Sequence, residues 1–330
     1  MFSQWITREP TTRLAPARRH GSGSTRRALA LAAALLIALV PSLGWACACG
    51  CGVFDVGTGT NMPTAEGGTA FLEWDYMDQN HNWAGTSSAP AANNTDKEIN
   101  THFITAGFQY LFNRTWGVMA EVPYWNRDFT TTDANGNIAT FNARGVGDIR
   151  IKGIYTGFSE DLSSGLTFGV KLPTGSDTSA GLDRDTQIGT GSTDVLLGGY
   201  HVGQLTADNK WNWFANAQLD QPALKTTDYR PGSEVDALSG VYFNDWTVLN
   251  DAVKLVPIAQ AKASWRWRDA GATSNFASSG YQRVYLSPGM EVDVGRYRFY
   301  ADVTLPVYTH VNGNQLVAYE LFKVIGSINF

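Results

Sequence analysis

Three cysteines at alternate positions are the side chains of this sequence best suited to chemistry. They are Cys47, Cys49 and Cys51, and the chain has no others. In an extended segment, residues two apart lie on one side, and thiolates gathered in this way bind soft metal ions such as copper or zinc. The spacing therefore favours a copper or zinc ion as a cofactor at this segment.

Three other fates of these cysteines stay open. An odd number of cysteines leaves at least one thiol free or bonded to another molecule. Neighbouring thiols also oxidise to disulfides outside the cytoplasm. A lipid anchor on Cys47 or Cys49 is a further alternative, although the bulky Trp45 fits a lipidation site poorly, and Cys47 could leave with a cleaved leader.

The segment before the cysteines has the layout of an export signal. A stretch with six arginines is followed by an apolar run from Ala28 to Val40, which is 13 residues long. A helix needs roughly 20 residues to cross a bilayer, and the small residues around Ala46 and Ala48 suit cleavage. We expect a cleaved signal peptide over 1–48 and a Cys/Gly-rich periplasmic segment over 49–67.

The charge of the chain excludes a nucleic-acid partner. The formal net charge is −5, and removal of 1–48 takes away six arginines and Glu9, which leaves −10. Binding to phosphates requires a basic patch. Charged residues make up only 17% of the chain, compared with roughly 25% in soluble domains.

Apolar residues after the leader recur at every second position. One stripe consists of Ile104, Ala106, Phe108, Tyr110 and Phe112. This period of two predicts strands. Each strand is long enough to cross a membrane when tilted, which takes roughly 9 to 11 residues.

The alternating segments predict an all-β fold of about 12 antiparallel strands that close into a single transmembrane barrel over 68–330. The predicted strands lie near 68–78, 100–112, 115–127, 145–157, 164–173, 192–204, 210–220, 234–244, 255–268, 281–294, 296–309 and 315–330. Long polar loops, such as 79–99, 128–144 and 174–191, alternate with short turns, as in outer-membrane barrels. Both termini then lie at the short-turn side, in the periplasm, and the protein lies in the outer membrane of a Gram-negative bacterium.

The end of the chain indicates how such a barrel would assemble. Apolar residues alternate from Phe322 to the terminal Phe330, and this pattern resembles the assembly signal of outer-membrane barrels. The expected partners are therefore outer-membrane lipid, periplasmic chaperones and the barrel-assembly machinery.

Charged residues occupy the positions between the apolar stripes. Lys152, for example, follows Ile151, and Lys262 follows Ala261. A charge that faces lipid at mid-membrane costs roughly 2–4 kcal/mol, so we expect these side chains inside the barrel. The residues expected to line a channel are Asp148, Arg150, Lys152, Lys171, Lys262, Arg266, Arg268, Arg283, Glu291, Arg298 and Asp302. They could line an aqueous pore or pair across the interior.

No constellation of catalytic residues is evident. The sequence has neither a G-x-S-x-G nor an H-E-x-x-H motif. His102 and His201 could face the lumen, and a barrel hydrolase with a Ser/His pair is the enzymatic alternative. We expect that the protein is not an enzyme and has no catalytic residues.

Two short segments resemble a known family. They are Gly169-Val170-Lys171-Leu172-Pro173-Thr174-Gly175 and Gln187-Ile188-Gly189-Thr190-Gly191-Ser192-Thr193-Asp194. A K-L-P-T-G-like strand end, a polar loop and a G-T-G-S-x-D-like strand start are similar to those of the outer-membrane barrels named for the MetA pathway of phenol degradation. The resemblance covers about 145–205 and implies a transport-like barrel for hydrophobic or aromatic small molecules.

Two functions are therefore considered. The first is an outer-membrane channel through which a small-molecule solute passes, motivated by the polar inner faces of the strands. The second is a non-conducting barrel that serves as a scaffold, whose cysteine segment binds a soft metal or a periplasmic redox partner.

Overall fold

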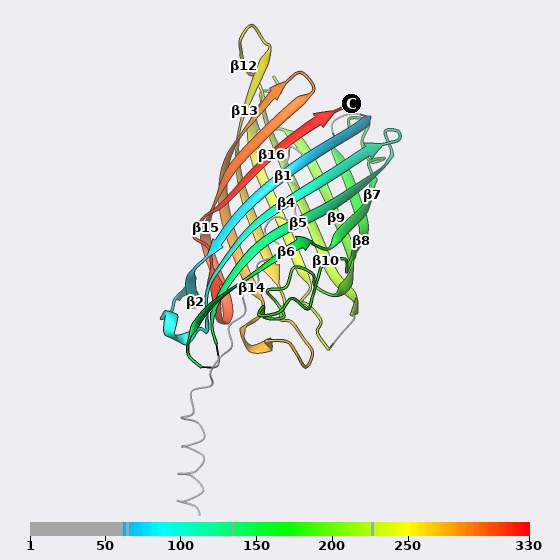
Figure 1. The fold of residues 1–330 in the computed structure, drawn as a ribbon. Helices are drawn as coiled ribbons and strands as arrows, with labels where there is room; N and C mark the ends of the chain where they lie inside the picture. Colours follow the sequence, from blue (N-terminus) through cyan, green and yellow to red (C-terminus); the bar gives the residue numbers. More distant parts are fainter. Residues whose placement is uncertain (1–61, 64–65, 134, 226–227) are drawn as a thin grey trace, which may run out of the picture. The chain divides into compact units, whose positions relative to one another are not determined.

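Twelve β-strands form the wall of a barrel in the computed structural model, which describes residues 62–63, 66–133, 135–225 and 228–330 (Figure 1). No helix among these residues is long and apolar enough to cross a membrane. The wall strands are β1 (Gly67–Gln79), β4 (Asp96–Leu111), β5 (Trp116–Thr132), β7 (Ile149–Tyr155), β8 (Ser164–Leu172), β9 (Ser192–Gln204), β10 (Trp211–Lys225), β11 (Glu234–Phe243), β13 (Val253–Arg266), β14 (Tyr281–Val294), β15 (Tyr297–Val317) and β16 (Leu321–Asn329).

The barrel closes between its first and last strands. Each wall strand is antiparallel to the next along the chain, and β1 pairs with β16 from Thr69↔Asn329 to Met77↔Leu321. Backbone hydrogen bonds in both directions join Gly68 to the terminal Phe330, at 2.8 and 2.9 Å. Closure satisfies the backbone groups that an open sheet edge would expose. The predicted all-β closed barrel of 12 antiparallel strands is confirmed.

The outer surface of the wall is apolar because alternate side chains point outward. On β4 these are Ile104, Phe108 and Tyr110, which are 38%, 43% and 37% exposed. The next outward position toward the start of the strand is His102, followed by the polar residue Asn100. The apolar zone suits hydrocarbon. The first residues of β4, from Asp96 to Asn100, therefore lie beyond the membrane-spanning part of the strand.

Aromatic side chains gather on the outer face near strand ends. Trp265 and Trp267 at the end of β13 stack with ring centroids 5.5 Å apart, and both are about half exposed. Trp74 and Tyr76 stack in the same way on β1. Such amphipathic rings suit the membrane interface.

The boundary between the last two strands differs from the prediction. β15 continues to Val317, and the turn to β16 follows it, whereas the sequence predicted a turn at 311–314. Gly313 has a φ of 61° and lies where the register shifts between Val311 and Asn314. The residues 311–314 therefore form a bulge within β15 and not a turn. Beyond this bulge, β15 continues by pairing with β2 (His81–Gly85).

Two segments predicted as loops also contain strands. Residues 79–99 hold β2, β3 (Ser87–Ser88) and the short 3₁₀ helix η2 (Ala91–Asn93). Residues 128–144 hold the end of β5 and most of β6 (Ile138–Val146), which pair with each other. At the opposite end of the barrel, β12 (Trp246–Val248) pairs with the start of β13. These short strands extend the wall at both ends of the barrel (Figure 1).

Replacing Ala261 by arginine should impair assembly of the barrel. Ala261 points outward on β13, opposite Ser239 and Leu286, and an arginine facing lipid at mid-membrane costs roughly 2–4 kcal/mol. Heat-modifiable migration after refolding into lipid vesicles measures the folded fraction. The matched variant Ala261→Leu should fold as the parent does. Equal folding of the arginine variant would contradict the assignment of this face to lipid.

Candidate functional site

Eight of the eleven charged residues predicted to line a channel are buried within the barrel wall. They are Asp148, Lys152, Lys171, Lys262, Arg266, Arg283, Glu291 and Asp302. Arg150 lies opposite the inward residue Glu121 in the register of β5 and β7. Arg298 contacts Glu291 and Asp293 at 3.4 and 3.1 Å. The interior of the barrel is therefore polar and charged.

Arg268 is placed differently from the other predicted residues. β13 ends at Arg266, and the Arg268 guanidinium donates to the backbone carbonyls of Phe276 and Ala277 at 2.7 and 2.9 Å. These carbonyls belong to the 3₁₀ helix η3 (Phe276–Ser278). Arg268 thus holds a loop together rather than continuing the inward face of the strand.

A hydrogen-bonded cluster of residues on β13 and β15 surrounds Asp302. Lys262 Nζ lies 3.0 Å from Asp302 Oδ2 and donates to Thr304 Oγ1 at 2.9 Å. Tyr300 Oη donates to the same carboxylate at 2.7 Å, and Gln260 Nε2 donates to it at 3.2 Å. The buried charge of Lys262 is therefore both paired and hydrogen-bonded, as a buried ion requires.

Lys323 forms a second buried ionic cluster and was not among the predicted site residues. Its ammonium lies 2.7 Å from Glu73 Oε1 and 3.3 Å from Asp75 Oδ1, and the residue is 1% exposed. The signal for it was present in the sequence, since Lys323 stands between the apolar residues Phe322 and Val324. This cluster also spans the seam between β1 and β16.

The third ionic cluster joins the two segments that resemble the MetA-pathway barrels. Lys171, in the first segment, faces Asp194, in the second, across the β8–β9 pair, and the two form an ion pair. Asp220 on β10 lies 3.1 Å from the same ammonium. On β5 and β7, Glu121 and Lys152 pair at 2.9 Å. Paired charges therefore line the inner face of the wall, and we name the pairs of Lys152, Lys171, Lys262 and Lys323 the ionic belt.

An apolar cluster lies near the end of the barrel at which β1 begins and β16 ends. We call this cluster the collar, and its buried members are Met62, Phe71, Met119, Ile154, Tyr200, Phe214, Leu238, Val256, Ile258, Tyr300 and Ile325. Phe214 and Tyr300 are at most 1% exposed. Met62 precedes β1, so the chain before the first strand also contributes a side chain to the collar.

At the opposite end, the loop between β8 and β9 folds into the barrel. This inner loop, residues 173–191, buries Thr186, Gln187 and Ile188. The Asp148 carboxylate accepts hydrogen bonds from the backbone N–H groups of Gly175 and Thr190 at 3.0 and 2.8 Å. Asp148 therefore fixes both ends of the inner loop. The sequence predicted this residue only as one that lines the channel.

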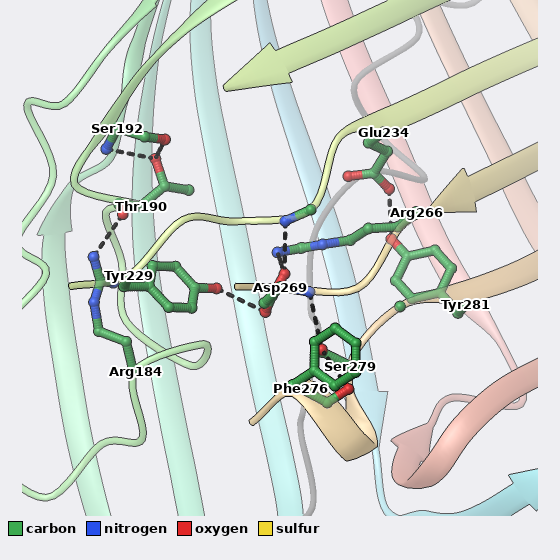
Figure 2. A network of polar contacts seen from close by, with 12 residues as sticks. Arg184, Thr190, Ser192, Tyr229, Glu234, Arg266, Asp269, Phe276, Ser279 and Tyr281 are labelled. Atoms are coloured by element: carbon green, nitrogen blue, oxygen red, sulfur yellow. Dashed lines mark hydrogen bonds and ion pairs between the residues drawn. The ribbon is translucent and has the colours of Figure 1, made fainter. Parts of the chain in front are cut away.

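A polar network links the other loops at this end (Figure 2). Asp269 is fully buried and accepts hydrogen bonds from Arg266 at 3.0 Å, from Tyr229 Oη at 2.8 Å and from the Gly232 N–H at 2.7 Å. Its own N–H donates to Ser279 Oγ at 3.0 Å. The Asp269 carboxylate thus connects β13 to the loop before β11, and the Asp269 backbone N–H connects the same residue to the loop before β14.

Arg184 connects this network to the inner loop. Its guanidinium carbon lies 4.2 Å from the centroid of the Tyr229 ring, in a cation–π contact. It also donates to the Thr190 carbonyl at 2.6 Å and pairs with Asp177 at 3.1 Å. Figure 2 shows this arrangement, in which three loops meet through Arg184, Tyr229 and Asp269.

The two histidines considered as lumen residues lie elsewhere. His102 faces outward and stacks with Trp74. His201 Nδ1 lies 2.7 Å from Ser164 Oγ, beside an outer groove of about 710 Å³ whose floor includes Ala217, Ala237 and other small residues. Among the described residues no carboxylate hydrogen-bonds His201, so the orienting third group of a hydrolase is not part of this pair.

Comparison with known proteins supports the fold. No protein-family model and no curated protein matches the chain. Among solved structures, an outer membrane channel from Pseudomonas putida F1 superimposes with a TM-score of 0.62 at 11% identity, covering 84% of this chain and 100% of that chain. The beta domain of the Bordetella autotransporter BrkA gives 0.47 at 12% identity, covering 80% and 100%. The monoaromatic hydrocarbon channel CymD gives 0.43 at 9%, covering 88% and 98%.

The first of these likenesses shows a shared barrel fold, and the other two are too weak to carry an argument.

The expectations that concern the amino terminus lie outside the described residues. These are the signal peptide over 1–48, nearly all of the segment 49–67, and the metal site at Cys47, Cys49 and Cys51.

Proposed function

We propose that this chain is an outer-membrane channel for small molecules, with both termini on the periplasmic side. The observation that carries the proposal is a closed barrel with an apolar outer face and a charged, hydrogen-bonded interior. In porins, an apolar outer band and a polar interior of this kind surround a water-filled channel. The carboxy-terminal strand would be recognised by the barrel-assembly machinery, after chaperones carry the unfolded chain across the periplasm.

The collar supports a small apolar or aromatic solute. A solute that crosses the lumen must pass between side chains such as Phe71, Phe214 and Ile325, and an apolar solute contacts these with less desolvation than a sugar or an ion. The resemblance at 145–205 points to the same class of solute. The solved barrel from Pseudomonas putida F1 is itself described as a channel.

The ionic belt would then give the lumen a rigid polar wall. The proposed lining residues are Asp148, Arg150, Lys152, Lys171, Lys262, Arg266, Arg283, Glu291, Arg298 and Asp302. Lys171 on β8 pairs with Asp220 on β10, and Lys262 on β13 pairs with Asp302 on β15. These charges therefore link strands that have another strand between them. We expect weak ion selectivity for this reason, since a paired charge attracts mobile ions less than an isolated one does.

Reconstitution of the purified barrel tests the proposal. We expect proteoliposomes to take up a small aromatic probe such as toluene or phenol faster than protein-free liposomes, and planar bilayers to show small conductance steps. The matched control is the same barrel, heat-denatured before reconstitution. A folded barrel that gives neither aromatic uptake nor conductance would exclude a channel.

A further inference from the structure

The inner loop is held inside the barrel by apolar packing and by a buried arginine. Leu182 packs against the cluster of Ile99, Phe129 and Leu316 on the inner wall. The fully buried Arg127 donates to the Thr186 carbonyl of the loop and to Thr101 Oγ1 of β4. These contacts favour the docked position of the loop.

A group of carboxylates opposes this docking. Asp96, the first residue of β4, is 1% exposed. Its Oδ1 accepts a hydrogen bond from Thr131 Oγ1 at 3.0 Å, whereas its Oδ2 has no hydrogen-bond partner among the described residues. The charges of Asp183 and Asp185 on the inner loop act on the Asp96 carboxyl. A buried carboxylate with an unpaired oxygen beside two like charges is costly to ionise.

Burial raises the pKa of Asp96 to about 8, and the charges of Asp183 and Asp185 contribute in the same direction. Burial also raises the pKa of Asp183 above the ordinary range. The charge of the neighbouring Lys97 opposes the shift. The Lys97 ammonium donates to the Ala91 and Asn94 carbonyls. The carboxyl of Asp96 lies beyond the apolar zone of β4. Water would reach this carboxyl if the inner loop left the barrel.

We propose that the inner loop is a pH-dependent closure of the barrel, docked when the Asp96 carboxyl carries a proton and released when that proton is lost. A proton suits this place better than a metal ion, because no group of three or more His, Cys, Asp or Glu side chains within the described residues could hold a metal. Only the consequence for solute passage rests on the proposed channel function.

The direction of the pH effect follows from proton linkage. The docked state binds a proton that the undocked state, with an ordinary carboxyl, releases at lower pH. Docking is therefore fully favoured below the ordinary carboxyl range and weakens as the pH rises to about 8, the value for Asp96 in the docked state. For one proton, the equilibrium constant of docking falls by at most about tenfold per pH unit.

Cleavage by trypsin at Arg184 reports the position of the inner loop without requiring conduction. Arg184 is protected in the docked loop, where its side chain is 15% exposed. Between about pH 6 and about pH 8 we expect the cleavage rate at this bond to rise by up to about tenfold per pH unit, after correction for the pH dependence of trypsin on an unstructured peptide of the same sequence.

Asp96→Asn is the deciding variant, because its side chain stays neutral. It should keep the loop protected across the same pH range. Asp183→Asn/Asp185→Asn removes two charges that raise the pKa of Asp96, so the rise in cleavage should be smaller and should end at a lower pH. Glu98→Gln is the matched control. It removes one carboxyl from the outward side of the same strand and should leave the rise unchanged.

Two results would overturn the proposal, provided that heat-modifiable migration shows folded barrels. One is an Asp96→Asn barrel with the same pH-dependent cleavage as the parent, and the other is faster cleavage of this variant at every pH. Planar-bilayer conductance measured on the same samples separates the two hypotheses. A barrel whose cleavage responds to pH but which never conducts retains the loop closure and excludes the channel.

Discussion

Lys323→Met will lower the free energy of unfolding of the barrel by about 3–5 kcal/mol, the range for breaking a buried ion pair by removing one partner. The substitution leaves Glu73 and Asp75, which are 7% and 1% exposed, as two neighbouring charges without their cation. It also removes a contact that crosses the β1–β16 seam. Urea unfolding in lipid vesicles, followed by tryptophan fluorescence, measures the change.

Two variants control this experiment. The triple variant Glu73→Gln/Asp75→Asn/Lys323→Met removes all three charges and should recover most of the lost stability, because the penalty comes from the uncompensated carboxylates. Lys210→Met breaks the exposed pair with Asp245 and should have no measurable effect. If Lys323→Met were as stable as the parent, the Lys323 ammonium would not stabilise the buried carboxyl groups of Glu73 and Asp75.

Phe214→Ala should open the collar and increase the flux of small aromatic solutes several-fold. Phe214 is fully buried among the collar residues, and loss of its ring leaves a cavity in this apolar cluster. The variant should also lose about 3–5 kcal/mol of stability, as buried Phe→Ala substitutions do. Uptake of an aromatic probe by proteoliposomes, normalised to the folded fraction, measures the effect.

Phe168→Ala is the matched control for the collar. Phe168 lies on the outer face of β8 and is 45% exposed, so its removal changes the lipid contact and leaves the lumen intact. Its flux should equal that of the parent. An equal rise in both variants would show that general loosening of the barrel, and not the collar, controls passage.

The alternation of side chains made most of the wall predictable. Ile104 on the outside and Lys152 on the inside follow from the period of two alone, because in a closed sheet one face meets lipid and the other meets the lumen. The same rule reaches Lys323 and Arg127, which lie on the inner parity of their strands. Pairing between these residues was not predictable, since it depends on the register of strands that are distant in sequence.

The structure of the loops could not be predicted from the alternation of apolar and polar residues. Arg268 continues the alternation of β13, yet the strand ends at Arg266, where Asp269 accepts hydrogen bonds from Arg266 and from Tyr229 and Gly232 of the loop before β11. The docking of the inner loop likewise depends on Arg127 and Thr186, which are 59 residues apart. Contacts of this kind carry no local periodicity, so a sequence pattern does not reveal them.

The seam between β1 and β16 has a consequence for how the barrel forms. The Thr69 hydroxyl and the Asn329 side chain that bond across it are separated by 260 residues along the chain. Closure of so long a loop carries a large entropic cost and belongs to the slow steps of folding. Until the last strand has emerged and reached the first, the sheet keeps two open edges that can pair with other chains. A nascent chain truncated within β16 would remain an aggregation-prone ribbon, which makes completion of the carboxy terminus the event that commits the protein to its folded state.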